Sequence, residues 1–514
     1  MASDLVLCVD SGTTSVKAAI YDRDGKALSR AEIPNSALVR SGNRVEQDMD
    51  QTLADVEKAI AACLGLDQSG AGITALALTA QGDGLWPLTN DLAPAGRAIT
   101  WLDGRSADLV ETMSGALDEI EAITSARPTS ASQTLQLLWL QRNEPERFQA
   151  IGHALRLKEW LFFRLTGELR AEFGSVLPAW GDWRSGKPVG DISRLLGLEK
   201  SIELLPEIGT VTSCIAGLSA QAADRLRLSA GLPVVLGPGD VQSSFVGLGV
   251  GPGLALTRAS VFGTSAIHGG YYAEANQVPV KLPGAMIQRF ATGEGFVCFH
   301  PCFNGGNVMR HVSALTGAGN IEISRPAFSG VVLHPFFEPG GERAPFTNPL
   351  ASAAAFGLSA DTTPEQLGWA AREALVFLAR ISHSDLGADE SNTVVAGGGV
   401  ARDPVVMQLL ASVLDRRVLP HTGGDSALRG LAAIAMGALE NSAGQGIPKD
   451  TYLSSPGKEV RPETGAIQIY YQRKFRLFAE LIEDISRHWK ELDALEAEAK
   501  GLSNGGHAPE RSAP

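Results

Sequence analysis

The stretch that decides the fold is residues 5–21, LVLCVDSGTTSVKAAIY, in which two apolar runs flank the turn DSGTTS. A tight turn of small hydroxylated residues between two strands leaves backbone N–H groups free to bind an anion. The hydroxyl groups of Thr13, Thr14 and Ser15 add donors that suit phosphate oxygens. Asp10 ends the first strand, where a carboxylate could hold the Mg²⁺ that accompanies a nucleotide. An ordinary hairpin with a Ser-Gly turn would look the same, so this stretch alone leaves both interpretations open.

A second copy of the pattern favours the phosphate interpretation. Residues 260–270, SVFGTSAIHGG, again lead from an apolar stretch into Gly263-Thr264-Ser265 and out into another apolar stretch. Two such hairpins, about 250 residues apart, predict a duplicated architecture with one phosphate loop in each half, gripping a polyphosphate from both sides of a cleft. Neither turn lies in a GxxxxGK[ST] P-loop. A strand rather than a helix is expected after each glycine, which excludes a dinucleotide-binding fingerprint.

Length and composition narrow the class of protein. The 514 residues predict two to four domains, and 44% hydrophobic residues exclude disorder as the reason for 57 glycines. A net charge of −13 argues against nucleic acid or an anionic membrane as the main partner. No secretory signal and no bilayer-spanning stretch is evident. The five scattered cysteines favour reduced thiols, and even Cys298 and Cys302, with His300 between them, lack a second pair of metal ligands. We therefore expect a cytoplasmic protein.

Strand and helix signals alternate along the chain, as in an α/β fold. The glycine-rich segment 247–253, GLGVGPG, predicts the seam between a first domain at 1–248 and a second at 249–500, and 501–514 is expected to be a disordered tail. We expect an amphipathic helix that begins at an Asp50 cap. The other expected strands are 28–33, 73–79, 233–236 and 393–396, and the other expected helices lie within 106–166 and at 364–381, 403–414 and 468–500.

Asp240 is the candidate catalytic base. It follows the buried strand 233–236 through Gly237-Pro238-Gly239, and strand carboxyl ends are where ligands bind in open α/β sheets. Transfer of a phosphoryl group to a hydroxyl needs a carboxylate to accept the hydroxyl proton. A helix cap is the ordinary reason for an Asp at this place, and it is the two phosphate-type hairpins that favour catalysis.

Two polar clusters suit a small polyhydroxylated ligand. Gln81-Gly82-Asp83-Gly84 follows one buried strand, and Trp101-Leu102-Asp103-Gly104-Arg105 comes about twenty residues later. Either cluster could also be a turn with a surface ion pair. The stretch 393–399, TVVAGGG, runs from a strand into three glycines that would let backbone approach an adenosine, with Asp403 nearby.

With these pieces in order, the chain resembles the FGGY family of carbohydrate kinases, from Val6 to about Phe475. The resemblance rests on the two hairpins, the segment at 101–105, Gly239-Asp240, Gly341-Glu342-Arg343-Ala344-Pro345 and Gly397-Gly398-Gly399. It implies an α/β fold of the actin-like superfamily, with two ribonuclease H-like domains that enclose a cleft. It also implies ATP and Mg²⁺, with Asp10 organising the metal and Asp240 as the base.

The resemblance further implies a set of binding residues. The acceptor residues would be Gln81, Gly82, Asp83, Trp101, Asp103, Arg105, Asp240 and Gln242. The nucleotide residues would be Ser11, Gly12, Thr13, Thr14, Ser15, Lys17, Gly263, Thr264, Ser265, Gly305, Gly397, Gly398, Gly399 and Asp403.

The chain departs from the family pattern at two places on the nucleotide side. Lys17 stands where many members have Arg, which keeps the charge and loses the fork geometry. The helix expected near Asp425 lacks the usual Glu-Ala start.

The acceptor segments look closest to the erythritol group. Gln81-Gly82-Asp83-Gly84 resembles the Gln-Gly-x-Gly of erythritol and L-xylulose kinases, and 158–167 and 180–183 look closer to erythritol kinases. The expected reaction is therefore ATP-dependent phosphorylation of a terminal hydroxyl, best of erythritol, with L-xylulose, D-xylulose or ribulose as the alternative. An ATP-driven conformational switch, or a sugar sensor without activity, is the rival outside this class. The helix-rich second half leaves room for a homodimer.

Overall fold

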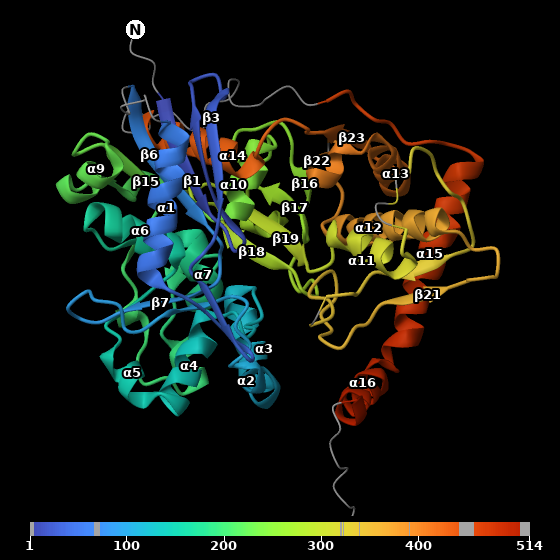
Figure 1. Ribbon diagram of the computed structural model, residues 1–514, viewed down its shortest axis with the longest axis horizontal. Helices are drawn as coiled ribbons and strands as arrows, with labels where there is room; N and C mark the ends of the chain where they lie inside the picture. The colour runs from blue at the N-terminus through green and yellow to red at the C-terminus, as the bar shows by residue number, and fades with distance from the viewer. Residues whose placement is uncertain are drawn as a thin grey trace, which may run out of the picture.

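Two large mixed sheets, each flanked by helices, form the body of the protein (Figure 1). The computed structural model describes residues 5–65, 72–318, 321, 323–338, 340–389, 391–440 and 457–503. Within these ranges no helix is both long and apolar enough to cross a membrane. The predicted two-domain α/β fold is confirmed.

The first sheet has six strands in the order β14-β15-β6-β1-β2-β3. Their bounds are β1 Leu5–Ser11, β2 Ser15–Tyr21, β3 Ala27–Pro34, β6 Ile73–Ala80, β14 Ile215–Gly217 and β15 Pro233–Leu236. β1 is antiparallel to β2 and parallel to β6, so the carboxyl ends of β1, β6 and β15 meet at one edge. That edge carries Asp10, Gln81 and Asp240.

The second sheet repeats this arrangement in the order β18-β19-β17-β16-β22-β23. Its strands are β16 Arg258–Phe262, β17 Ala266–Tyr272, β18 Met286–Arg289, β19 Phe296–Cys302, β22 Thr393–Gly398 and β23 Arg417–Pro420. β16 is antiparallel to β17 and parallel to β22, just as β1 is to β2 and β6. The duplication predicted from the two hairpins is present in five strands of each sheet, since β15-β6-β1-β2-β3 corresponds to β23-β22-β16-β17-β19, whereas β14 and β18 are added at opposite edges.

A third sheet of five strands extends the first half, in the order β4-β5-β8-β7-β9. Its strands are β4 Leu38–Ser41, β5 Arg44–Gln47, β7 Gly84–Leu88, β8 Ala98–Thr100 and β9 His153–Leu155. It carries the segments 81–84 and 101–105 at the ends of its strands. Shorter pairs elsewhere are β10 Arg170–Glu172 with β13 Glu207–Gly209, β11 Gly181–Asp182 with β12 Lys187–Pro188, and β20 Val332–His334 with β21 Ala354–Phe356.

Helices of the first half cover the first and third sheets. They are α1 Met49–Leu64, α2 Ala107–Thr112, α3 Ser114–Thr124, α4 Gln133–Asn143, α5 Pro145–Ala150, α6 Leu157–Thr166, α7 Phe173–Trp180, α8 Asp191–Leu196, α9 Ala220–Leu226 and α10 Asp240–Gly247. The cap of α1 is Asp48, whose carboxylate accepts from the Gln51 N–H, and Asp50 is already helical. The expected Asp50 cap was therefore two residues too late.

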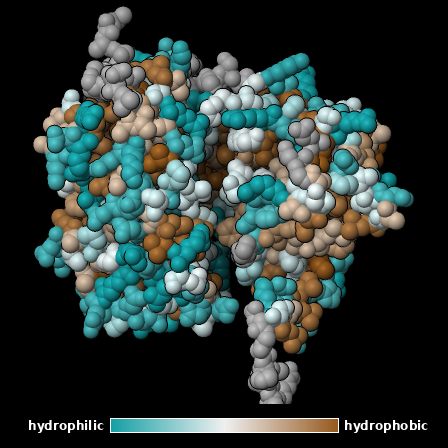
Figure 2. Space-filling model, in the orientation of Figure 1, coloured by the Kyte–Doolittle hydropathy of each residue, from teal (hydrophilic) through white to brown (hydrophobic). Residues whose placement is uncertain are grey.

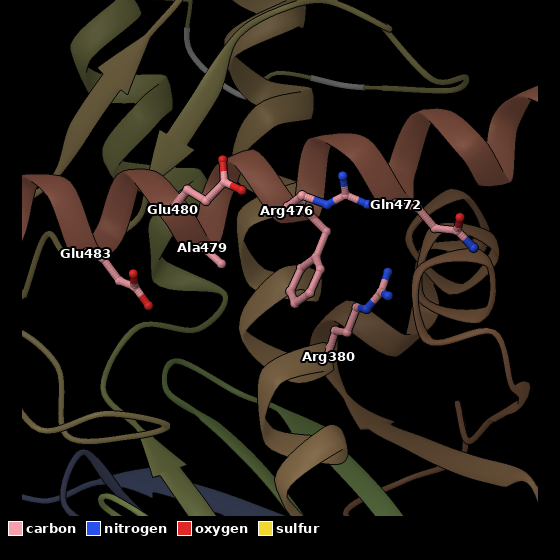
Figure 3. A pocket seen from close by; sticks show the side chains of 7 residues that line it. Arg380, Gln472, Arg476, Ala479, Glu480 and Glu483 are labelled. Carbon is pink, nitrogen blue, oxygen red and sulfur yellow. The ribbon is translucent and has the colours of Figure 1, made fainter.

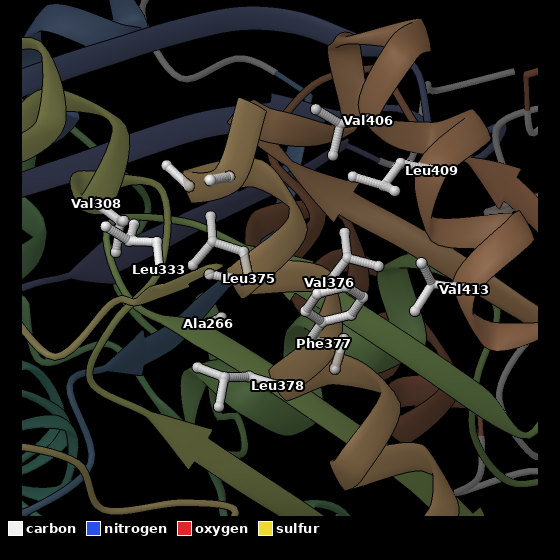
Figure 4. Packing of buried hydrophobic residues seen from close by; sticks show 14 of the residues in the cluster. Ala266, Val308, Leu333, Leu375, Val376, Phe377, Leu378, Val406, Leu409 and Val413 are labelled. Atoms are coloured by element: carbon white, nitrogen blue, oxygen red, sulfur yellow. The ribbon is translucent and has the colours of Figure 1, made fainter. Parts of the chain in front are cut away.

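Helices of the second half are α11 Asn307–Thr316, α12 Pro364–Asp385, α13 Pro404–Leu414, α14 Ser426–Glu440, α15 Ala466–Ser486 and α16 Trp489–Ser503. α12 crosses the second sheet and packs Leu375, Phe377 and Leu378 into a core shared with α13 and α15 (Figure 4). Such close packing fixes the sheet that carries the second turn.

The helix expected at 468–500 is broken into two. α15 ends at Ser486, and α16 begins at Trp489, whose indole is 1% exposed and packs on Phe346. α16 continues through Ser503, so the start of the segment expected to be disordered is helical, and residues 504–514 lie outside the described residues.

α10 and α14 lie between the two sheets and join them (Figure 1). Phe245 of α10 packs with Phe299 of the second sheet, whereas Val246 and Leu431 pack with Val6 of the first. α14 thus comes from the second half of the chain and completes the core of the first. The two helix backbones touch, because Gly247 faces the Ser426 carbonyl and Gly430 faces the Ser243 carbonyl.

We predict that Gly430→Ala destabilises the protein, because the added Cβ would overlap the Ser243 carbonyl oxygen. Overpacking of this kind costs roughly 1–3 kcal/mol. Thermal unfolding of Gly430→Ala should show a melting temperature several degrees below that of the parent. Gly115→Ala on α3, where a Cβ meets nothing within 4 Å, is the matched control and should be neutral or stabilising. Equal melting temperatures for the two variants would contradict the tight crossing.

Candidate active site

The first turn is built as an open nest at the end of β1. The Gly12 N–H donates to the Ser15 carbonyl at 3.0 Å, and Asn35 ties the turn down through its side chain to the Gly12 carbonyl. Thr14 at the tip is exposed, while Ser11 is buried and Ser15 donates to Glu32. This turn can present backbone N–H groups and hydroxyls to an anion.

The second turn has the same construction between β16 and β17. The Gly263 N–H donates to the Ser265 carbonyl at 2.9 Å, and Gly263, Thr264 and Ser265 are all exposed. Gly305 packs directly under the turn, where a Cβ would overlap the Ser265 backbone. The Gly306 N–H donates to the Gly263 carbonyl at 2.9 Å. Gly305 therefore supports the turn by permitting close backbone approach.

The glycine run at 397–399 ends β22 beside the second turn. Gly398 has φ 89° and a Cβ there would overlap the Phe262 carbonyl, so only glycine fits. Gly398 and Gly399 are exposed, and Gly397 is buried against Leu248. Asp403 caps α13 by accepting from the Val405 and Val406 N–H groups, so its carboxylate is already engaged.

A hydrogen-bond network joins the first turn to the polar cluster. The Thr13 hydroxyl donates to Gln81 Oε1 at 2.6 Å, and the Trp101 indole N–H donates to Thr13 Oγ1 at 2.8 Å and to Gln81 Oε1 at 3.0 Å. Gln81 in turn donates to Gln47. The candidate phosphate and acceptor residues thus form one connected site, although they lie far apart in the sequence.

Asp103, Arg105 and Gln242 lie inside the wall of this site. The Asp103 carboxylate, fully buried, accepts from the Val45 N–H and from the Arg105 guanidinium at 2.8 Å. The Gln242 amide is also buried, and it donates to Gln288 and accepts from the Ala291 N–H. These three side chains hold the segments that carry Trp101 and Asp240.

Asp240 is the first residue of α10, one position after the cap Gly239, and it is partly exposed. Its Oδ1 accepts from the Val241 N–H at 2.9 Å. Burial, together with the charge of Asp83, raises the pKa of Asp240 from 3.8 to about 6, while the Val241 hydrogen bond and Arg343 oppose the rise. A carboxylate with this pKa is ionised at pH 7 yet basic enough to accept a proton.

Asp10 lies deeper, at the carboxyl end of β1. Burial, then the charges of Asp425 and Asp240, raises the pKa of Asp10 to about 7, although Lys17 opposes the rise. Lys17 instead pairs with Asp425 at the start of α14, with Nζ 2.9 Å from Oδ2. This ion pair links β2 of the first sheet to the second half of the chain.

The donor set at Asp10 fits a divalent cation. Within the part of the chain that the structure describes, no hydrogen bond reaches the Asp10 carboxylate, and no group of three or more His, Cys, Asp or Glu side chains could hold a metal by itself. Mg²⁺ commonly takes only one or two carboxylates and completes its shell with water and substrate phosphates. Asp10 meets that requirement.

Arg343 and Glu342 were not among the predicted site residues, although their motif was recognised. Glu342, 1% exposed, accepts from the Phe303 N–H at 2.7 Å and from Asn304 at 3.0 Å, which anchors the loop that leads to Gly305. Arg343 donates through Nε to the Pro301 carbonyl, and its charge acts on Asp83 and Asp240. The sequence signal for these two residues is the Glu342-Arg343 pair within the motif at 341–345.

The two halves face each other across a narrow furrow (Figure 2), and a cavity of about 50 Å³ lies between them. Asp83 and Arg156 line it from the first half, and Arg343 and Thr347 from the second. A larger hollow of about 380 Å³ on the outer face of α15, between Arg380, Gln472 and Arg476, includes none of the predicted site residues (Figure 3).

Comparisons with known proteins bear on the chain as a whole. Residues 5–247 match the model of the FGGY family of carbohydrate kinases, N-terminal domain, and residues 259–439 match that of the C-terminal domain. The chain is 28% identical to an erythritol kinase from Brucella abortus over 85% of this chain and 88% of that protein. It is 31% identical to a xylulose kinase from Streptomyces rubiginosus, over 85% and 88% of the two chains.

Among solved structures, a xylulose kinase from Brucella ovis superposes with a TM-score of 0.84 at 21% identity, covering 94% of this chain and 99% of that one. The fold predicted by resemblance is confirmed by this likeness and by the two family models, which together span most of the chain.

We predict that Asp10→Asn raises thermal stability in the absence of nucleotide and Mg²⁺. Because burial and the charges of Asp425 and Asp240 raise the folded-state pKa of Asp10 from 3.8 to about 7, the ionised carboxylate destabilises the folded state once the pH exceeds about 4. At pH 8 the variant should gain roughly 1–4 kcal/mol in the free energy of unfolding. The gain should shrink at pH 5, where the folded-state carboxyl is already protonated.

The check is the melting temperature at both pH values in EDTA, with Asp50→Asn as the control on an exposed carboxylate. A lower melting temperature at pH 8, or a gain that does not depend on pH, would contradict the charged environment described for Asp10.

Proposed function

The chain belongs to the FGGY family of carbohydrate kinases and is a phosphotransferase that uses ATP and an alcohol acceptor; we propose that it phosphorylates a terminal hydroxyl of a small polyol, with erythritol as the best candidate. The observation that carries the proposal is the Thr13–Gln81–Trp101 network, which ties the first turn to a cluster of amide, carboxylate and indole groups. Such groups suit the hydroxyls and the C–H face of a short polyol.

In this proposal Asp240 accepts the proton of the attacking hydroxyl. The acceptor oxygen then forms a bond to the γ-phosphorus, the bond from that phosphorus to the β–γ bridging oxygen breaks, and the electron pair leaves with ADP. Asp240 is suited to this step because its carboxylate lies at the start of α10, where the helix N-terminus faces the ligand side of the sheet. Little other covalent work is required of the protein.

The two turns at Gly12–Thr14 and Gly263–Ser265 hold the phosphates in this proposal, and Gly397–Gly399 admits the adenosine. Asp10 would hold Mg²⁺, and the metal would neutralise charge on the phosphates. The residues of the chain position the acceptor and exclude water, which would otherwise compete as a phosphoryl acceptor. Five unpaired, buried cysteines and the use of ATP support a cytoplasmic location.

Two relatives lead to different acceptors. The erythritol kinase from Brucella abortus supports a polyol, as does Gln81-Gly82-Asp83-Gly84. The xylulose kinase from Streptomyces rubiginosus is slightly more similar by identity and supports a ketopentose as the second candidate. Both acceptors present a primary hydroxyl and would use the same base.

The proposal is tested by measuring ADP formation with ATP, Mg²⁺ and a panel of erythritol, glycerol, xylitol, L-xylulose, D-xylulose, ribulose and gluconate. We expect kcat/KM for erythritol to exceed the others by at least about tenfold. A preference for a pentulose would replace the acceptor and keep the mechanism. No turnover with any member would contradict the proposed acceptor class.

We predict that Asp240→Asn lowers kcat by about 10²–10⁴-fold, the usual contribution of a general base, with KM for ATP within about threefold of the parent. In the parent, kcat/KM for the acceptor should fall below pH 6 as Asp240 becomes protonated. Asp191→Asn is the control, since Asp191 is also the first residue of a helix but is exposed. Substantial residual turnover in Asp240→Asn would rule out the base.

A further inference from the structure

Arg156 is a buried arginine between β9 and α6, and it has no part in the proposed mechanism. Its side chain is 6% exposed. Nη1 donates to the Gly82 carbonyl at 3.0 Å and lies 3.1 Å from Asp83 Oδ1. Nη2 is buried and has no hydrogen-bond partner among the residues that the structure describes. A buried guanidinium N–H without a partner carries a desolvation penalty that a ligand oxygen would relieve.

The cavity between the two halves lies beside this guanidinium. Arg156 and Asp83 line it together with hydroxyl-bearing residues, among them Thr129, Ser132 and Thr347. Its volume of about 50 Å³ has room for roughly three to five water molecules, or for a few hydroxyl groups of a ligand. The cavity is small and lies between the two halves of the chain, and its charged and hydroxyl groups share the wall with apolar residues such as Ala126, Pro178 and Met286.

The other charged groups around the cavity leave Arg156 as a free donor. Arg127 is engaged by Asp118 and Glu121, and Arg343 is held by the Pro301 carbonyl on the opposite wall. Asp83 keeps part of its carboxylate exposed beside Arg156, and its charge also acts on Asp240. The cavity thus has a donor, Arg156, and an acceptor, Asp83, side by side, and the charge of Asp83 reaches Asp240.

We infer that Arg156 binds an oxygen of the acceptor beyond the reacting carbon and so determines acceptor specificity. This inference rests on the proposed function. An acceptor whose reacting hydroxyl lies at Asp240 would extend its remaining carbons into the cavity, where Nη2 donates to an acceptor oxygen and Asp83 accepts from a hydroxyl. The ligand class is a polyol or ketose with oxygens on neighbouring carbons, and an acceptor that lacks the matching oxygen is discriminated against.

This arrangement requires the two terminal nitrogens of a guanidinium group. One terminal nitrogen fixes the turn at Gly82 and Asp83, and the other remains for the ligand. Lysine would supply a single ammonium and could not serve both. Arg156→Lys should therefore resemble Arg156→Gln more closely than the parent.

The test is steady-state kinetics of the full-length protein with the best acceptor of the panel. Arg156→Gln should raise KM for the acceptor by about 10–100-fold, as expected for loss of a charged hydrogen bond, with KM for ATP within about twofold. Arg164→Gln, on the exposed side of the same helix and paired with Asp50, is the matched control and should behave as the parent. An unchanged acceptor KM in Arg156→Gln would overturn the inference.

Mono-deoxy analogues of that acceptor separate direct binding from mere support of Asp83. In the parent, removing the oxygen that meets Arg156 should lower kcat/KM by about 10–100-fold, and in Arg156→Gln the same removal should have less than about a threefold effect. If every deoxygenation is equally costly in both proteins, Arg156 does not contact the acceptor and the inference is wrong. If the best acceptor of the panel is a pentulose, the proposed substrate changes and the inference about Arg156 does not. The two proteins are then compared with that ketose and its deoxy analogues.

Discussion

The contact of the α10 and α14 backbones at Gly247 and Gly430 is the constraint on which the rest of the structure depends. Side chains of α10 reach both sheets, and α14 returns from the second half to cover the first sheet. Arg429 reinforces the crossing by donating to the Gly247 carbonyl. Because α10 begins with Asp240 and α14 begins beside Asp425, this one crossing places the proposed base and the partner of Lys17 in fixed relation to both turns.

The site gathers charge that the folded chain alone does not neutralise. Asp425 and Asp240 both act on Asp10 through their charges, and of these three carboxylates only Asp425 has a cation within hydrogen-bond distance among the described residues. Such a cluster lowers stability, as is common where function and stability compete, and the proposed cation and nucleotide would relieve it. The Thr13–Gln81–Trp101 network joins the first turn to the proposed acceptor residues by hydrogen bonds.

The fold and most of the site follow from the sequence because they depend on local pattern. The hairpins at Gly12 and Gly263, the strand that leads to Asp240 and the glycines at 397–399 all carry short-range signals, and the structure places them as expected. Arg156 could not be found in this way, since its role depends on an unpartnered nitrogen and on a cavity between segments distant in the sequence. The burial of Asp103 and the return of α14 to the first sheet are likewise outcomes of tertiary packing, which local periodicity does not encode.

We propose that both turns hold one nucleotide between the two halves of the chain. Hydrogen–deuterium exchange, followed by mass spectrometry with and without a non-hydrolysable ATP analogue and Mg²⁺, tests it most directly. We expect slower exchange at residues 11–17, 263–267 and 397–403. All three segments should become protected at the same nucleotide concentration. Protection of one turn alone, with the other unchanged at saturation, would contradict it.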